Sequence, residues 1–160
     1  MTAAIISIIP EFLEKIALLD LEEHFTVTKT SIVNNVSGSE IIFKGIKTSS
    51  GDQTANLKSL QGITTWILDE AEELTDEETF DKIDLSVRQK GMQNRVILIM
   101  NPTTKAHWIY SRFFEDAKVP EGSNLTKDDT TYIHTTYPDN IDNLADSYIS
   151  QIHKMQIEKP

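Results

Sequence analysis

The run "RVILIM", residues 95–100, constrains the fold of this chain more than any other stretch. Five apolar residues follow Arg95 without the alternation that marks a half-exposed strand. An unbroken run of this kind is typical of a strand that is covered on both faces, as in a parallel sheet. A second apolar, β-rich run, "ITTWIL", occupies residues 63–68. The two runs therefore predict two buried strands of an α/β fold.

A helix is predicted between these strands. Thr75 and Glu78 have the spacing of a capping box, and the helix is expected to run to about residue 89, where Gly91 closes it. A right-handed strand–helix–strand crossover places the ends of both strands on the same edge of a sheet. The predicted buried stripe of this helix consists of Phe80, Ile83 and Val87.

The remaining elements follow from the same kinds of pattern. Helices are expected at residues 11–21, with Pro10 near the start, at about 107–114 and at about 145–156. Strands are expected at residues 24–30 and 130–137, a hairpin at 31–45, and a loop at 116–129. The order predicts an α/β fold with a mainly parallel central sheet.

Composition narrows the class of protein. A chain of 160 residues with 39% hydrophobic residues suits one domain. Its 25 acidic and 15 basic residues give a formal charge of -10, which argues against a large phosphate-binding surface on this chain alone. The absence of cysteine excludes disulfides and thiolate metal sites. No apolar run approaches the roughly 20 residues that span a membrane, so a soluble intracellular protein is expected.

Both predicted strands end in polar residues. Asp69 and Glu70 follow the first strand, and Asn101 follows the second. Ligands of open α/β sheets bind beyond the carboxyl ends of the strands. If the two strands are close neighbours, the side chains of Asn101 and Asp69 would converge on one small ligand.

Apolar residues followed by Asp-Glu have the form of a Walker B motif. In such a site the Asp carboxylate enters a Mg²⁺ shell, and the adjacent Glu polarises the attacking water. Strand ends often carry acids, however, so the pattern alone leaves this interpretation open for Asp69 and Glu70. Five further acids follow within residues 72–78, and they favour a helix N-terminus through its dipole. They are Glu72, Glu73, Asp76, Glu77 and Glu78.

Four blocks of the chain resemble, in order and spacing, the large subunit of tailed-phage terminases. The resemblance covers residues 20–158, and its blocks are "GSEIIFKGI", "LKSLQGITTWILDEAEELT", "VILIMNPTTKAHWIYSRFF" and "IHTTYPDN". It implies a motor that couples ATP hydrolysis to the pumping of viral DNA into a capsid. In that family an ATPase of the additional-strand P-loop type precedes an RNase H-like nuclease.

The resemblance also assigns roles to residues. Asp69 would hold Mg²⁺, and Glu70 would be the catalytic carboxylate acting on ATP. Asn101, Pro102 and Thr103 would match the motif that couples hydrolysis to movement. Motors of this kind use a basic residue supplied in trans, for which Lys58 and Arg112 are candidates.

The resemblance implies partners and a location as well. The partners would be double-stranded DNA, the terminase small subunit, the portal protein and further copies of the chain in a ring. The location would be the cytoplasm of the bacterial host cell, with no membrane.

The chain departs from the family pattern in one important respect. It contains no Gly-x-x-x-x-Gly-Lys-Ser/Thr, the loop that cradles phosphates. Residues 1–160 are therefore expected to be a partial ATPase domain, with a sheet that is incomplete on its N-terminal side, no nuclease domain and weak ATP binding. Exposed sheet edges would then invite self-association. The alternative is a non-catalytic assembly or remnant fragment that works only with a complementary P-loop-bearing chain. A third possibility, a helicase core fragment, lacks the further Arg-bearing motifs that helicases need.

Overall fold

The structure, a computed structural model, describes residues 2–45, 62–101 and 104–158. The chain divides into two compact units, Met1–Thr103 (unit 1) and Thr104–Pro160 (unit 2). Both units contain helices and strands, so the predicted mixture of α and β structure is confirmed. The predicted mainly parallel sheet is not, because two of the three sheets in the described residues are antiparallel. Within the described ranges, no helix is both long enough and apolar enough to cross a membrane.

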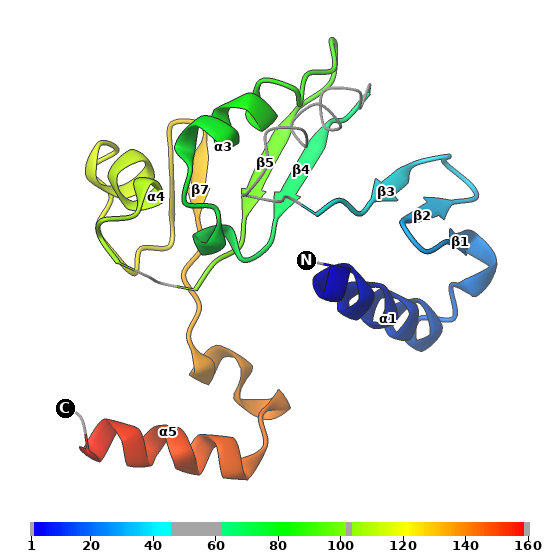
Figure 1. Ribbon diagram of the computed structural model, residues 1–160. Coiled ribbons are helices and arrows are strands. Elements are labelled where there is room, and N and C mark those ends of the chain that lie inside the picture. Colours follow the sequence, from blue (N-terminus) through cyan, green and yellow to red (C-terminus); the bar gives the residue numbers. More distant parts are fainter. Residues whose placement is uncertain (1, 46–61, 102–103, 159–160) are drawn as a thin grey trace. The chain divides into compact units, whose positions relative to one another are not determined.

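Unit 1 begins with a helix and an antiparallel sheet (Figure 1). Helix α1 (Thr2–Leu18) and the short turn η1 (Glu22–His24) precede three strands in the order β1-β2-β3. Ile32, at the centre of the sheet, is only 2% exposed. The predicted hairpin is confirmed, but the predicted helix start near Pro10 is wrong, because α1 continues through that proline. The strands are β1 (Phe25–Val27), β2 (Ser31–Asn34) and β3 (Glu40–Ile42).

The two apolar runs form a parallel pair of strands, β4 (Thr65–Leu68) and β5 (Arg95–Leu98). Leu68 lies opposite Leu98, and the ladder continues past that pair. The Ile99 amide donates to the Leu68 carbonyl at 2.9 Å, and the Ala71 amide donates to the Ile99 carbonyl at 2.9 Å. The two strands are therefore direct neighbours, and their carboxyl ends meet at one edge.

Helix α3 (Glu77–Asp84) connects these strands and packs beside them (Figure 1). The ring of Phe80 lies 5.3 Å from the ring of Trp66 on β4, centroid to centroid. The predicted stripe is confirmed, because Phe80, Ile83 and Val87 are all buried. Helix α3 thus covers part of one face of the β4–β5 pair.

The predicted ends of this helix need correction. Asp76, not Thr75, is the N-cap residue, because its carboxylate accepts the Thr79 amide at 3.1 Å. The helix ends at Asp84 rather than near residue 89. Just beyond it the Ser86 hydroxyl donates to the Lys82 carbonyl at 2.8 Å, and such local side-chain bonds compete with helical pairing.

The other face of the β4–β5 pair carries exposed apolar side chains. Ile67 is 57% exposed, its partner Ile97 is 40% exposed and Ile99 is 51% exposed. Parallel sheets are normally covered on both faces. The prediction that both strands are buried is therefore wrong for this face, although the strands themselves are confirmed. In the described part of the chain the parallel sheet has two strands, and the larger P-loop NTPase sheet stays a prediction.

The described part of unit 2 contains a hairpin and three helical regions. Strands β6 (Leu125–Lys127) and β7 (Thr130–Tyr132) pair antiparallel. The predicted loop at residues 116–129 is therefore wrong where β6 forms, at Leu125–Lys127. The strand expected at residues 130–137 is shorter: β7 ends at Tyr132, residues 133–136 form neither helix nor strand, and the 3₁₀ segment η4 (Tyr137–Asn143) follows. Helix α5 (Asp146–Glu158) closes the unit, as predicted.

The start of unit 2 is a short helical segment packed on aromatic rings. Helix α4 (Trp108–Tyr110) continues into the π-helical segment η3 (Ser111–Glu115). The Tyr132 hydroxyl donates to the Phe113 carbonyl at 2.6 Å, and burial raises the pKa of that hydroxyl. The hairpin is thereby tied to the π-helical turn, where backbone pairing is irregular.

Candidate functional site

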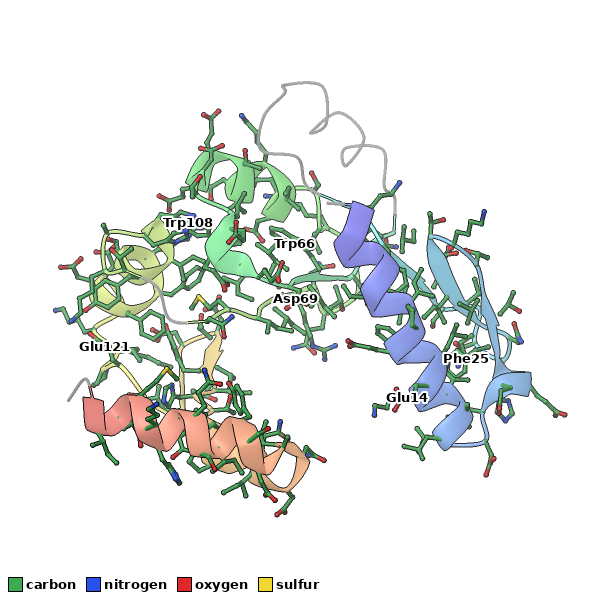
Figure 2. All side chains as sticks on the ribbon, turned by 60° about the horizontal axis from the view of Figure 1, so that its bottom comes forward. Glu14, Phe25, Trp66, Asp69, Trp108 and Glu121 are labelled. Atoms are coloured by element: carbon green, nitrogen blue, oxygen red, sulfur yellow. The ribbon has the colours of Figure 1, made fainter. Side chains whose placement is uncertain are left out.

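The candidate site lies at the carboxyl ends of β4 and β5, where Figure 2 labels Asp69. Asp69 and Glu70 follow β4 directly, and Asn101 lies three residues after the end of β5. All three side chains are exposed. The parallel pairing of the strands brings these two segments to the same edge, as the sequence predicted.

Glu70 has a left-handed backbone conformation, with φ 52° and ψ 47°. This conformation costs a non-glycine residue about 1–2 kcal/mol. Two hydrogen bonds hold this conformation. The Glu70 amide donates to Asp69 Oδ1 at 3.1 Å, and the Glu70 carbonyl accepts from the Glu73 amide at 2.9 Å. Backbone strain of this kind is concentrated at functional sites, so Glu70 is a stronger candidate than its sequence pattern alone suggests.

Asp69 has the chemistry of a magnesium ligand. One carboxylate oxygen accepts the Glu70 amide, and no other hydrogen bond of this side chain is recorded among the described residues. In the same part of the chain no three His, Cys, Asp or Glu side chains are grouped to hold a metal by themselves. Mg²⁺ is commonly bound by one or two carboxylates together with waters and substrate phosphates. The residues therefore fit a metal–phosphate complex better than an all-protein metal cage.

Glu72 is a member of this edge that sequence reasoning missed. It lies in the 3₁₀ turn η2 (Ala71–Glu73), before α3, and its side chain is half-buried. Its Oε1 accepts both the Asn101 backbone amide at 3.2 Å and Asn101 Nδ2 at 3.1 Å. Glu72 does lie in the first turn of a short helix, as predicted, but the structure adds the contact with Asn101. Nothing in the local pattern separates Glu72 from its acidic neighbours, because its partner is 29 residues away.

The other later acids behave more as predicted. Asp76 caps α3 with one carboxylate oxygen, and Glu78 forms a 2.6 Å ion pair with Lys82 one turn later. Both act within the helix and its first turn. The acids of residues 69–78 thus form two groups. One group, which includes Glu72, lies at the tip of the strand, and the other starts at Asp76 and belongs to the helix.

The remaining predicted site residues are not tested by this geometry. Lys58, Pro102 and Thr103 lie outside the described residues. Arg112 lies in η3 of unit 2, and its guanidinium carbon is 5.6 Å from the centre of the Phe113 ring. Their proposed basic and coupling roles stay predictions.

Comparisons with known proteins agree on one family. The family model described as phage terminase large subunit matches residues 3–160. The PBSX phage terminase large subunit of Bacillus subtilis (strain 168) is 29% identical over 134 residues. That alignment covers 78% of this chain but only 29% of the relative, so the chain spans less than a third of that relative's length.

Proposed function

The chain belongs to the phage terminase large subunit family, and we propose that it is part of the ATP-hydrolysing motor that drives viral DNA into the capsid. One observation carries the proposal: the parallel strands β4 and β5 bring Asp69, Glu70 and Asn101 to a single edge. That edge is where open α/β sheets bind their ligands.

The two acids have different roles in this proposal. Asp69 would bind Mg²⁺, which supplies positive charge to the phosphates of ATP when it is bound. Glu70 would act as general base by accepting a proton from the attacking water. Asn101, with Pro102 and Thr103, would respond to the state of the nucleotide and couple it to movement. Lys58 or Arg112 would supply the basic residue in trans.

Binding of ATP by this chain alone is expected to be weak. The sequence has no Gly-x-x-x-x-Gly-Lys-Ser/Thr, whose backbone amides and lysine make most contacts to a triphosphate. We propose that the complete motor acts on double-stranded DNA in the host cytoplasm. It would assemble as a ring with the small subunit and the portal protein.

A titration of the ¹⁵N-labelled chain with Mg²⁺ and then Mg·ATP tests the proposal. We expect the amide signals of Asp69, Glu70 and Asn101 to shift, and Asp69→Asn to weaken that response about tenfold, because one carboxylate is lost from the metal shell. Asp128→Asn is the matched control, since Asp128 is an exposed aspartate whose left-handed conformation asparagine tolerates. Shifts that avoid this edge, or that persist unchanged in Asp69→Asn, would contradict the proposal.

The exposed apolar face of β4–β5 favours a second candidate function. Because Ile67, Ile97 and Ile99 are exposed, this chain would act as a non-catalytic assembly part that works only with a complementary P-loop-bearing chain. A separate chain that bears the missing loop distinguishes the two functions. Binding of Mg·ATP only after that chain is added supports this second function, whereas binding by the isolated chain supports the first.

A further inference from the structure

Glu72 and Asn101 form a two-point contact between the ends of the two parallel strands. A single carboxylate oxygen of Glu72 accepts the backbone amide of Asn101 at 3.2 Å and its side-chain Nδ2 at 3.1 Å. One bond would leave the Asn101 side chain free to rotate. Two bonds to the same oxygen fix the backbone and the side chain of Asn101 together.

The chemistry of the carboxylate also determines which way the Asn101 amide faces. An ionised carboxylate only accepts hydrogen bonds, so the amide NH₂ must face Glu72. The Asn101 Oδ1 then faces away, and no hydrogen bond to it is recorded among the described residues. Asn101 therefore presents one acceptor oxygen and one remaining N–H to any ligand at this edge.

The turn that carries Glu72 is itself held in place. Ala71 is fully buried, and its amide donates to the Ile99 carbonyl at 2.9 Å. Leu74, at the other end of the turn, is 3% exposed. Glu72 is therefore fixed relative to β5 before its own side chain makes any bond, so it is suited to position Asn101.

We propose that Glu72 is a positioning residue that holds Asn101 in one orientation, with its amide oxygen outward, before any ligand arrives. It acts through Asn101 and need not touch the nucleotide. The outward oxygen would accept a hydrogen bond from water, and the free N–H would donate to a phosphate oxygen. The identity of that ligand rests on the proposed function, whereas the orientation of Asn101 does not.

Substitutions at Glu72, followed by NMR of the full ¹⁵N-labelled chain without nucleotide, test the proposal. We expect Glu72→Ala to move the backbone and side-chain amide signals of Asn101. It should also speed hydrogen exchange at the Asn101 backbone amide about tenfold, because a hydrogen bond to a charged group is lost. Glu72→Gln, which keeps an acceptor oxygen of the same reach, should restore most of both readouts.

Glu73→Ala is the matched control, because Glu73 is an exposed neighbour in the same 3₁₀ turn. It should leave the Asn101 signals unchanged. Asn101 signals that are the same in Glu72→Ala and wild type, or that move equally in Glu73→Ala, would overturn the proposal.

A measurement on the wild-type chain tests the proposal even if the Glu72→Ala variant does not fold. The side-chain NH₂ of Asn101 should have an order parameter close to the rigid value of about 0.85. The exposed Gln151 on α5 serves as the flexible reference. An Asn101 value below about 0.6 would overturn the proposal without any substitution.

Repeating the Mg·ATP titration on Glu72→Ala separates this inference from the proposed function. If Mg·ATP shifts no signal at the edge of β4 and β5, but the amide signals and hydrogen exchange of Asn101 change in Glu72→Ala, the proposed function fails and the positioning role stands. If Mg·ATP binds at that edge and Glu72→Ala leaves Asn101 unaffected, the positioning role fails and the proposed function stands.

Discussion

At the scale of single residues, Glu70 combines a strained backbone with a side chain proposed for catalysis. Glycine adopts its left-handed conformation without steric cost. Replacing Glu70 with glycine removes the steric strain but also increases the entropy of the unfolded chain, which opposes the gain. We expect Glu70→Gly to raise the free energy of unfolding by a net amount of about 0.5–1 kcal/mol. Urea denaturation measures this change.

The control for that substitution is Glu73→Gly. Glu73 lies in the right-handed part of the same turn, where glycine should lower the free energy of unfolding by about 0.5–1 kcal/mol. Equal destabilisation by both substitutions would show that Glu70 carries no strain. A stabilised Glu70→Gly with no response to Mg·ATP would fit a residue retained for function at the expense of stability.

Sequence reasoning identified three of the four residues at the tips of the strands, namely Asp69, Glu70 and Asn101. Asp69 and Asn101 were predictable because each directly follows, or nearly follows, an apolar run. Glu72 was not predictable, because its role depends on a contact with the backbone and side chain of Asn101. The left-handed conformation of Glu70 was equally hidden, since glutamate has no preference for it.

At the scale of elements, α3 depends on its N-cap. A hydrogen bond from the Thr79 hydroxyl, helped by backbone amides, holds the pKa of Asp76 below its ordinary value. A lowered pKa in the folded state contributes stability that is present above the unfolded pKa of about 4 and is lost as pH falls through the folded value.

Asp76→Asn tests this contribution. Asparagine also caps helices but does not ionise in this range. We therefore expect wild type to lose stability more steeply than Asp76→Asn as the pH is lowered from about 5 to 3, in thermal melts followed by circular dichroism. Parallel pH profiles of the two proteins would show that the Asp76 cap does not depend on its charge.

Element types were more predictable than element boundaries. The unbroken apolar runs gave β4 and β5. The predicted stripe gave the buried side of α3, Phe80 and Ile83, together with Val87, which is buried just beyond the helix. The end of α3 and the strand β6 were missed. The first was set by side-chain bonds to the backbone, and the second by pairing with β7 in a segment whose three residues are all exposed.

At the scale of the whole molecule, the exposed face of the β4–β5 pair predicts self-association. Ile97 lies in the middle of that face, opposite Ile67. We expect Ile97→Lys to lower the apparent mass in light scattering, because a charge there opposes apolar contact between copies. Leu85→Lys is the control and should change little, because Leu85 is an apolar residue at the C-cap of α3 that is 58% exposed. A wild-type chain that is monomeric at every concentration would contradict this expectation.

The sequence by itself determined the mixed α/β composition, the two strands β4 and β5, the acids at their tips and the resemblance to the family that the comparisons then showed. These features are local, since apolar runs, helical spacing and ordered motifs are read from neighbouring residues. Only the tertiary structure decided that Glu72 belongs with Asn101, that Glu70 is left-handed and that one face of the parallel pair is exposed. Those features depend on the register between β4 and β5, which joins residues about thirty positions apart, and no local pattern encodes that pairing.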